Sequence, residues 1–502
     1  MRDKLSRRKA IALAAKSSMG MVLLPSLYAN SSAAENKKRQ VPILDVLKYN
    51  AVGDGITLDT FAIQRAIDDA AKESGGAQVL LPGGHRYLIG ALELRSGIDF
   101  HIAGNAELLI STNKEHYTTK ESYTKEQYNK GEGGSVITAN EAHGLTFSGA
   151  GVINGRALEF MSHYDKELEW WRPAGWRPKL FQLTGCRDLQ IKDITVMQSP
   201  TWTLHMIGCE GVLIDNLKIR NNLEIPNCDG IVPDHCRDVE IRNCNITCGD
   251  DAIVVKTTQR EKDYGPSAHI RVKDCVIETQ DSGLVIGAET FQDIYDVRFE
   301  NCEIKMSSRG LSISHRNEGN IYDIEFNNIT FVSCYHSKPW WGRGEAITLT
   351  AIPFTPGSKI GKIHDVRFNN IKGKAENSVR VSGTEESRIQ NVTFENVDIL
   401  FDRWTKHQGG LFDNRWTTAY PDIEPHGNPG FLVRFADNVN LNKCNVAWGK
   451  NRIDRLVING ERTFQPDFFT YALEAYNVTG LKYTNFTGES AHPERFKAIL
   501  IH

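Results

Sequence analysis

Apolar residues recur in short apolar-x-apolar pairs along the middle of the chain. Residues two apart on an extended strand face the same side, so each pair marks one buried strand face. The pairs are Leu189/Ile191, Val212/Ile214, Val239/Ile241, Ile270/Val272, Val297/Phe299, Ile324/Phe326, Val366/Phe368 and Val392/Phe394. Their spacings of 23, 27, 31, 27, 27, 42 and 26 residues predict a parallel β-solenoid, in which each turn of the chain stacks on the previous one.

An Asn or Asp follows the first residue of every pair by four positions. Such side chains tolerate left-handed backbone, so we expect a sharp corner that repeats on each coil. Cys244, Cys275 and Cys302 come directly after three of these corners. We interpret them as a buried stack, because no Cys-x-x-Cys or His-x-x-x-His spacing predicts a metal site. The corner residues are Asp193, Asn216, Asn243, Asp274, Asn301, Asn328, Asn370 and Asn396.

The segment before the repeats has a different pattern. Residues 60–72 have the apolar spacing of a helix, with Thr57 or Asp59 available as its N-cap, and strand pattern begins at 79–82. We expect this helix to cover the open end of the solenoid core, which such folds must protect.

The first 35 residues are typical of an export signal. Five basic residues among the first nine precede an Ala-rich apolar stretch, and small residues at 32–34 suit cleavage. Arg7-Arg8 also resembles a twin-arginine signal, and the choice between the two export routes stays open. We therefore expect a periplasmic or secreted protein, with residues 36–502 forming one solenoid domain.

The composition of the chain argues against nucleic acid and membranes as partners. The net charge of −3 gives no electrostatic bias toward nucleic acid or an anionic membrane, and no segment after the signal is apolar enough to span a membrane. A solenoid grows by adding coils, so 502 residues fit one domain. We expect a monomer whose partner is a polysaccharide or oligosaccharide substrate.

Three carboxylates stand out within the repeats. Asn227 and Asp229 share a face if that segment is extended, and 21 residues, about one short coil, separate Asp229 from Asp250. Gly249 permits a bend that turns both Asp250 and Asp251 into one groove. Crowded acids raise at least one pKa and so keep a proton available, which favours acid/base chemistry.

These motifs resemble glycoside hydrolase family 28, the polygalacturonases and their relatives. The resemblance rests on residues 51–55, 81–84 and 199–202 and, most specifically, on 227–234 with 248–253. It implies a right-handed parallel β-helix, an all-β fold of the pectin lyase-like type. It further implies hydrolysis of pectin-type polysaccharides with inversion, without a metal or an organic cofactor. By the same resemblance Asp250 is the general acid, while Asp229 and Asp251 hold and deprotonate the attacking water.

The chain departs from the family pattern at two places. Asp281 stands where the family commonly has a histidine, and Ser312 and Ser314 replace the Arg-x-Lys pair that binds a uronate carboxylate. Plain galacturonan is therefore a poor fit, and a rhamnose or a modified uronate is the better candidate. Our candidate substrate-binding residues are Asn227, Lys256, Asp281, His315, Arg316 and Trp341.

Two irregular segments are candidates for the walls of a binding groove. Residues 340–345 interrupt the repeat and lengthen one coil to 42 residues, and long solenoid loops often build the binding face. Residues 403–430 form a second irregular stretch, which we expect to close one end of the groove. A closed end favours attack at chain termini.

Two other functions remain open at this level. A polysaccharide lyase on the same fold needs calcium-binding acids and an Arg or Lys base, and its products absorb ultraviolet light. A non-catalytic carbohydrate-binding solenoid explains the aromatic residues but leaves the gathered acids without a role.

Overall fold

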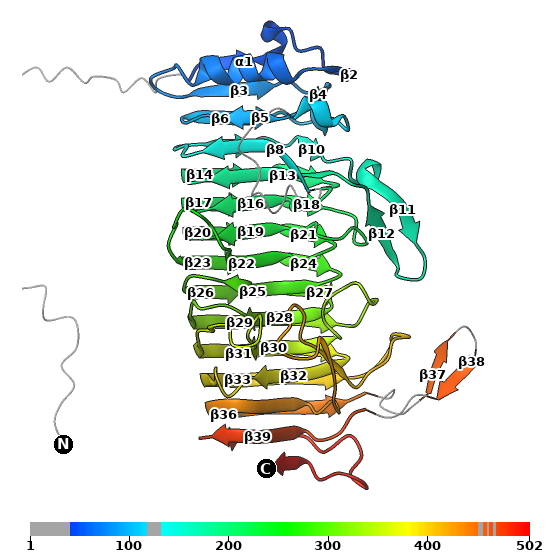
Figure 1. Ribbon diagram of the computed structural model, residues 1–502. Helices are drawn as coiled ribbons and strands as arrows, with labels where there is room; N and C mark the ends of the chain where they lie inside the picture. Colours follow the sequence, from blue (N-terminus) through cyan, green and yellow to red (C-terminus); the bar gives the residue numbers. More distant parts are fainter. Residues whose placement is uncertain (1–40, 118–131, 450–454, 459–460, 465–467) are drawn as a thin grey trace, which may run out of the picture. The chain divides into compact units, whose positions relative to one another are not determined.

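A computed structural model describes residues 41–117, 132–449, 455–458, 461–464 and 468–502. The predicted export signal lies outside these ranges. Within them, parallel strands follow one another coil by coil from α1 to β39 (Figure 1). The prediction of an all-β parallel solenoid is confirmed. Among the described residues, no helix is long and apolar enough to cross a membrane.

The strands fall into ladders that run along the stack. The first coils contain β1 (Ile43–Asp45), β2 (Asp54–Leu58), β3 (Ala77–Leu81), β4 (Arg86–Ile89), β5 (Leu92–Leu94), β6 (Ile98–Ile102), β7 (Glu107–Ile110), β8 (Glu132–Asn140), β9 (Thr146–Ser148) and β10 (Val152–Asn154). The ladder that later carries the site contains β13 (Arg177–Thr184), β16 (Leu204–Ile207), β19 (Ile231–Asp234), β22 (Ile253–Thr257), β25 (Ser282–Thr290), β28 (Arg309–His315), β30 (Glu345–Ala351) and β32 (Asn377–Ser382).

Two further ladders complete each coil. One contains β14 (Arg187–Lys192), β17 (Glu210–Asp215), β20 (Arg237–Arg242), β23 (Ser267–Lys273) and β26 (Ile294–Glu300), and the other β15 (Thr195–Met197), β18 (Lys218–Arg220), β21 (Asn245–Cys248), β24 (Val276–Thr279) and β27 (Glu303–Ser307). In the later coils, longer strands run through both ladders: β29 (Ile321–Ser333), β31 (Ile363–Ala375), β33 (Ile389–Phe401) and β36 (Phe431–Trp448). The last coils contain β39 (Leu473–Thr479), β40 (Lys482–Thr484) and β41 (Ile499–Ile501).

Short elements leave the coils. They are three antiparallel hairpins, β11 (Met161–Asp165) with β12 (Trp170–Pro173), β34 (Leu411–Asp413) with β35 (Ile423–Pro425), and β37 (Arg455–Ile458) with β38 (Glu461–Phe464), and the 3-10 helices η1 (Val46–Tyr49), η2 (Lys114–His116) and η3 (Ala157–Phe160).

The apolar pairs of the sequence stack in register. Leu189 pairs with Val212, Val212 with Val239, and Val239 with Ile270, and the alignment continues to Val392. Four phenylalanines at the second position of a pair form a column inside the core, with ring centroids 4.7 to 4.9 Å apart: Phe299, Phe326, Phe368 and Phe394. Burial of these columns holds successive coils together.

The predicted corner residues all adopt left-handed backbone. Their φ angles lie between 53° and 65°, as the short polar side chains allow. The side chains also bond along the stack: Asn328 donates to Asn301 at 2.8 Å and Asn370 donates to Asn328 at 2.9 Å. All ten cysteines are buried and free, which agrees with a packing role.

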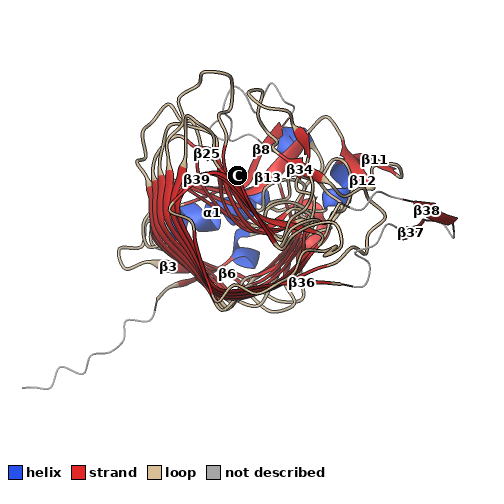
Figure 2. Cartoon of the chain, turned by 90° about the horizontal axis from the view of Figure 1, so that it is seen from below, coloured by secondary structure: helices blue, strands red, loops and turns tan. Residues whose placement is uncertain are grey.

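The helix α1 (Thr60–Ala70) covers the first coils. Its Ile63, Ala66 and Ile67 are fully buried, and Figure 2, seen along the stack, shows α1 lying across the interior that the strands enclose. Asp59 occupies the N-cap position without capping the helix. Its carboxylate instead accepts the backbone N–H groups of Val52 and Gly53 at 2.6 and 3.0 Å, which fixes the preceding turn.

Candidate active site

Asp229, Asp250 and Asp251 lie together where the chain enters β19 and β22. One carboxylate oxygen of each residue lies within 4.8 Å of those of the other two. Parallel register explains the meeting, because Ile231 of β19 pairs with Ile253 of β22 and each follows its aspartate by two positions. Such a cluster fits acid/base chemistry, and its oxygens are also close enough together to hold one cation.

The segment around Asn227 is a turn rather than the extended strand that the sequence predicted. Asn227 has left-handed backbone (φ 59°), and β19 begins only at Ile231. The Asn227 carboxamide oxygen accepts a bond from Arg177 at 2.9 Å, and its backbone N–H donates to Asp250 Oδ2 at 2.9 Å. The turn therefore positions the acids through its backbone.

Gly249 is required by close packing against the preceding coil. A Cβ atom there would stand 2.3 Å from the Ile225 carbonyl oxygen, so any side chain would displace the turn that carries Asp250. The Asp250 carboxylate accepts the N–H of Asp251 as well as that of Asn227, each at 2.9 Å. These two donors orient Asp250 without using its neighbours' oxygens.

The cluster stabilises protonated carboxyls. Burial raises the pKa of Asp229, Asp250 and Asp251, and the charge of Asp250 raises the pKa of Asp229 further. Lys256 opposes these shifts and lowers the pKa of all three. The two N–H donors favour the ionised form of Asp250, so its pKa is raised less than those of its neighbours.

Asp281 adds a fourth carboxyl. On the next coil Asp281 is at the position equivalent to Asp250. Ile253 pairs with Leu284, and Asp250 and Asp281 come three residues before Ile253 and Leu284, respectively. Burial, followed by the charge of Asp250, raises the Asp281 pKa to about 7. Its Oδ2 accepts the backbone N–H of Trp341 at 3.1 Å, and Oδ1 accepts the Ser282 hydroxyl at 2.9 Å. Asp281 thus lies beside the three acids, close enough to interact electrostatically with Asp250 and Asp251, and Trp341 contacts Asp281 through its backbone N–H.

Lys256 lies among aromatic and acidic groups beside the acids. Its ammonium bonds Glu289 at 3.1 Å and lies 5.0 Å from the ring centre of Trp202. Lys179 lies over the same ring at 4.2 Å. Trp202 in turn packs on an outward-facing apolar row, Val232, Val254 and Val285, so the surface beside the acids is aromatic and cationic.

The β34–β35 hairpin and its connecting turn cover the ladder beyond the acids. Asp413 is 1% exposed and accepts the backbone N–H of Gly342 at 2.9 Å. Its carboxylate binds Arg415 at 2.6 Å, and its carbonyl oxygen accepts from Arg380 of β32 at 3.4 Å. We refer to residues 411–425 as the cover segment.

Neither His315 nor Arg316 lies with the acids: Arg316 lies beneath this cover, whereas His315 packs against the preceding coil. His315 is fully buried and bonds the Thr290 hydroxyl at 2.7 Å. Arg316 is 2% exposed and donates to the carbonyl oxygens of Asn414 and Arg415 at 3.2 and 3.3 Å. In this conformation both side chains anchor loops, and a contact of either with substrate stays a prediction.

Several residues of the site were not predicted from the sequence. Arg177, Glu289 and Asp413 come from other coils and from a loop, and no spacing relates them to the acids. Arg380 is different, because its alternation between Val379 and Val381 marks it as an outward-facing residue of a strand. Pairing places Arg380 in one row with Ser312 and Thr348.

Comparison with known proteins agrees with this geometry. A family model described as glycosyl hydrolases family 28 matches residues 75–408. A probable polygalacturonase of Vitis vinifera is 28% identical over 298 residues, covering 53% of this chain and 59% of the relative. An endo-polygalacturonase of Pectobacterium carotovorum subsp. carotovorum is 22% identical over 399 residues, covering 77% and 94%. The chain spans about half the length of the plant relatives it matches first.

The fold is also shared with a solved structure. The exopolygalacturonase of Thermotoga maritima superposes with a TM-score of 0.65 at 22% identity, covering 85% of this chain and 96% of that one.

Proposed function

The chain belongs to family 28 of the glycosyl hydrolases, and from that premise we propose that it hydrolyses glycosidic bonds of pectin-type polysaccharides or oligosaccharides. The observation that carries the proposal is the meeting of Asp229, Asp250 and Asp251 within 4.8 Å. A non-catalytic solenoid has no use for buried carboxyls whose mutual repulsion costs stability.

We assign the acid role to Asp250 by family resemblance. Asp250 protonates the glycosidic oxygen as the bond to the anomeric carbon breaks. Asp229 and Asp251 hold a water molecule and take its proton as its oxygen attacks that carbon, which yields a reducing sugar and a free alcohol. Carboxyl groups of inverting enzymes are usually about 6.5–9.5 Å apart, and the closest oxygens here lie nearer, so inversion rests on the family and not on this spacing.

For the substrate we propose a rhamnose or a modified uronate at the cleavage site in place of a plain galacturonate. Each bond between a cationic side chain and a carboxylate contributes about 1.5–3 kcal/mol, and Ser312 and Ser314 supply no cation. The arginines near them already have partners, because Arg316 and Arg380 bond the cover segment. A bare uronate therefore lacks a free cation pair among the described residues of this ladder.

We further propose attack at chain ends. Ser312, Thr348 and Arg380 form an outward-facing row, yet each is at most 1% exposed because the cover segment and its neighbours lie over the ladder. A polysaccharide chain running along the ladder meets this cover just beyond the acids. The acids can then act only on the unit at the end of a polysaccharide chain, because the chain cannot extend past the cover.

The experiment compares the wild-type protein with Asp250→Asn on defined pectic oligosaccharides, following reducing ends, ultraviolet absorbance and released sugars together. New reducing ends without absorbance, absent in the variant, support hydrolysis. Ultraviolet absorbance characteristic of an unsaturated uronate product indicates a lyase instead. Binding of the oligosaccharide without any product indicates a carbohydrate-binding protein. The initial anomer seen by proton NMR tests inversion.

Export and a monomeric state are part of the proposal. The basic and apolar pattern of residues 1–35 supports export. N-terminal sequencing of the protein from periplasm and medium tests the cleavage, and light scattering of the mature protein tests the monomer.

A further inference from the structure

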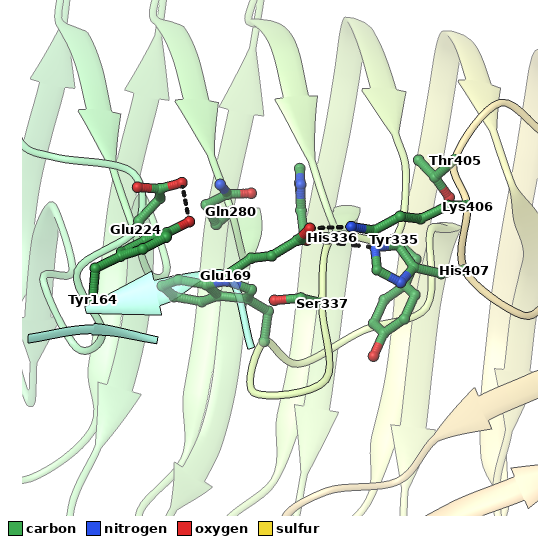
Figure 3. A pocket seen from close by; sticks show the side chains of 11 residues that line it. Tyr164, Glu169, Glu224, Gln280, Tyr335, His336, Ser337, Thr405, Lys406 and His407 are labelled. Atoms are coloured by element: carbon green, nitrogen blue, oxygen red, sulfur yellow. Dashed lines mark hydrogen bonds and ion pairs between the residues drawn. The ribbon is translucent and has the colours of Figure 1, made fainter. Parts of the chain in front are cut away.

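A pocket of about 340 Å³ lies beside the acid cluster and takes no part in the chemistry described above. Figure 3 shows side chains from separate segments converging on it, among them Tyr164 and Glu169 of the β11–β12 hairpin, Glu224, Tyr335 and Lys406. Its volume falls within the range of about 300–1,000 Å³ that is usual for small-molecule sites.

The pocket shares its walls with the acid cluster. Gln280 lines it and directly precedes Asp281, while Trp340 lines it and precedes Trp341, whose N–H bonds Asp281. Glu224, also in the wall, belongs to the turn that leads to Asn227. A sugar in the pocket therefore adjoins a sugar whose glycosidic bond lies at the acids.

The wall offers what a sugar requires. Aromatic rings stack on the apolar faces of sugars; Tyr164 is the partly exposed ring of the wall, while Tyr335 and Trp340 line the pocket as buried rings. Three buried wall atoms have no hydrogen-bond partner among the described residues: Gln280 Oε1, His336 Nε2 and Trp340 Nε1. Buried polar atoms without a partner cost free energy, so a ligand hydroxyl that reaches one of them gains a hydrogen bond. Trp340 itself is 2% exposed.

The charges of the wall favour a neutral ligand. Glu224 accepts the Tyr164 hydroxyl at 2.9 Å, and Glu169 forms an ion pair with Lys406. Burial lowers the pKa of His336 to about 4 and also lowers the pKa of His407, so both rings are neutral at pH 7. Two carboxylates then face one ammonium group, and a uronate brings a further negative charge to the pocket.

We propose that this pocket binds a neutral sugar unit of the substrate, next to the unit cleaved at the acids. The inference rests on the proposed function and adds to it the composition of the neighbouring unit. Selection against a uronate comes from the carboxylates, which repel its negative charge, whereas aromatic stacking contributes affinity for neutral and acidic sugars alike.

The test measures binding in the Asp250→Asn protein, so that turnover does not interfere. Rhamnose, xylose, galactose and galacturonate are titrated separately and followed by ligand-observed NMR. We expect at least one neutral sugar to bind tenfold or more tightly than galacturonate. In the Asp250→Asn background, a second substitution Glu224→Gln should reduce the ratio of neutral-sugar affinity to galacturonate affinity to threefold or less. The second substitution Tyr164→Leu should weaken neutral-sugar binding at least threefold. Glu141→Gln is the matched control, because Glu141 pairs with Lys262 on an exposed surface away from this pocket.

Galacturonate binding as tight as that of every neutral sugar overturns the inference, as does binding that Glu224→Gln and Tyr164→Leu leave unchanged. The proposed hydrolysis is judged separately on the wild-type enzyme. If the enzyme hydrolyses substrate but sugar binding does not depend on the pocket residues, only the proposal of a neutral-sugar pocket is wrong. If binding depends on the pocket residues but no hydrolysis occurs, only the catalytic proposal is wrong.

Discussion

The backbone N–H of Asn227 donates to Asp250 Oδ2 at 2.9 Å, which links the two halves of the acid cluster across one coil. Because Asp250 also accepts the Asp251 N–H, two donors stabilise its ionised form. An acid that protonates a leaving group must start protonated, so these bonds and the charges of Lys256 and Arg177 oppose the proposed role, while burial of Asp250 supports it.

Substitution of the cluster by amides separates the roles of its members. We expect Asp250→Asn, Asp229→Asn and Asp251→Asn each to lower kcat by about 10²–10⁴-fold, the usual contribution of a general acid or base. The pH profile of residual kcat/KM distinguishes them. Loss of the acid removes the fall in rate at high pH, whereas loss of a base removes the fall at low pH. If Asp229→Asn rather than Asp250→Asn abolishes the high-pH limb, the assignment must be exchanged.

Lys256 sets the pH range of the cluster. Its charge lowers the pKa of the three acids, so Lys256→Met should raise them. The low-pH limb of kcat/KM, which reports ionisation of the base, then moves to higher pH. Lys262→Met is the control, because Lys262 is 60% exposed and pairs with Glu141. An unshifted profile in Lys256→Met would show that Lys256 does not act on the ionisation of the acids.

Asp281 should make stability fall as the pH rises. Its folded pKa of about 7 exceeds the ordinary value near 3.9, so between these values the folded state holds a proton that the unfolded state has lost. The contribution of Asp281 to stability is therefore largest below about pH 4 and is lost progressively as the pH rises to about 7. Asp281→Asn stays neutral and keeps an acceptor for Trp341, and its Tm relative to wild type should rise between pH 5 and pH 8.

Asp437 provides the matched comparison for that experiment. Arg388 lowers its pKa to about 2, so from pH 5 to pH 8 the carboxylate is ionised in both states. Asp437→Asn should then lower the Tm by a similar amount across this range. A Tm difference for Asp281→Asn that is equally flat contradicts the raised pKa of Asp281.

The cover segment depends on Asp413. Its carboxylate is fully buried between Arg415 and the Gly342 N–H, and loss of one partner from a buried ion pair typically costs about 3–5 kcal/mol. Asp413→Asn should lower the Tm by several degrees and loosen the cover, so that longer products appear from polymeric substrate. Asp323→Asn is the control, since Asp323 is 55% exposed in its pair with Arg298. An unchanged product length in a clearly destabilised Asp413→Asn contradicts the link between cover and terminal attack.

The contribution of the left-handed corner residues to stability can be tested at Asn328, where φ is 53°. Asn328→Ala places an ordinary residue in left-handed backbone, which costs about 1–2 kcal/mol, and removes the bonds to Asn301 and Asn370. Asn328→Gly loses the same bonds but tolerates the backbone. The Tm of Asn328→Ala should therefore lie below that of Asn328→Gly, and equal values would mean that the bonds alone matter.

The solenoid repeat could be predicted from the sequence because it depends on local chemistry. Paired apolar residues such as Val297/Phe299 must be buried, and Asn328 and its equivalents must turn the chain, so periodicity of these types determines a stacked solenoid. The same periodicity brought Asp229 and Asp250 together, since one coil separates them. Register along a parallel ladder is fixed by the hydrophobic pattern, and the pattern is present in every coil.

Tertiary structure decided what surrounds the acids. The left-handed turn at Asn227 and the pairing of Lys256 with Glu289 depend on contacts between neighbouring coils. The burial of Arg316 under Asn414 and Arg415 depends on a loop about 100 residues later in the chain. Loops such as 403–430 have no period, and their path is set by which buried charges they satisfy, here Arg380 and Arg316. A sequence pattern states which residues must be buried, but only the folded chain determines which loop covers them.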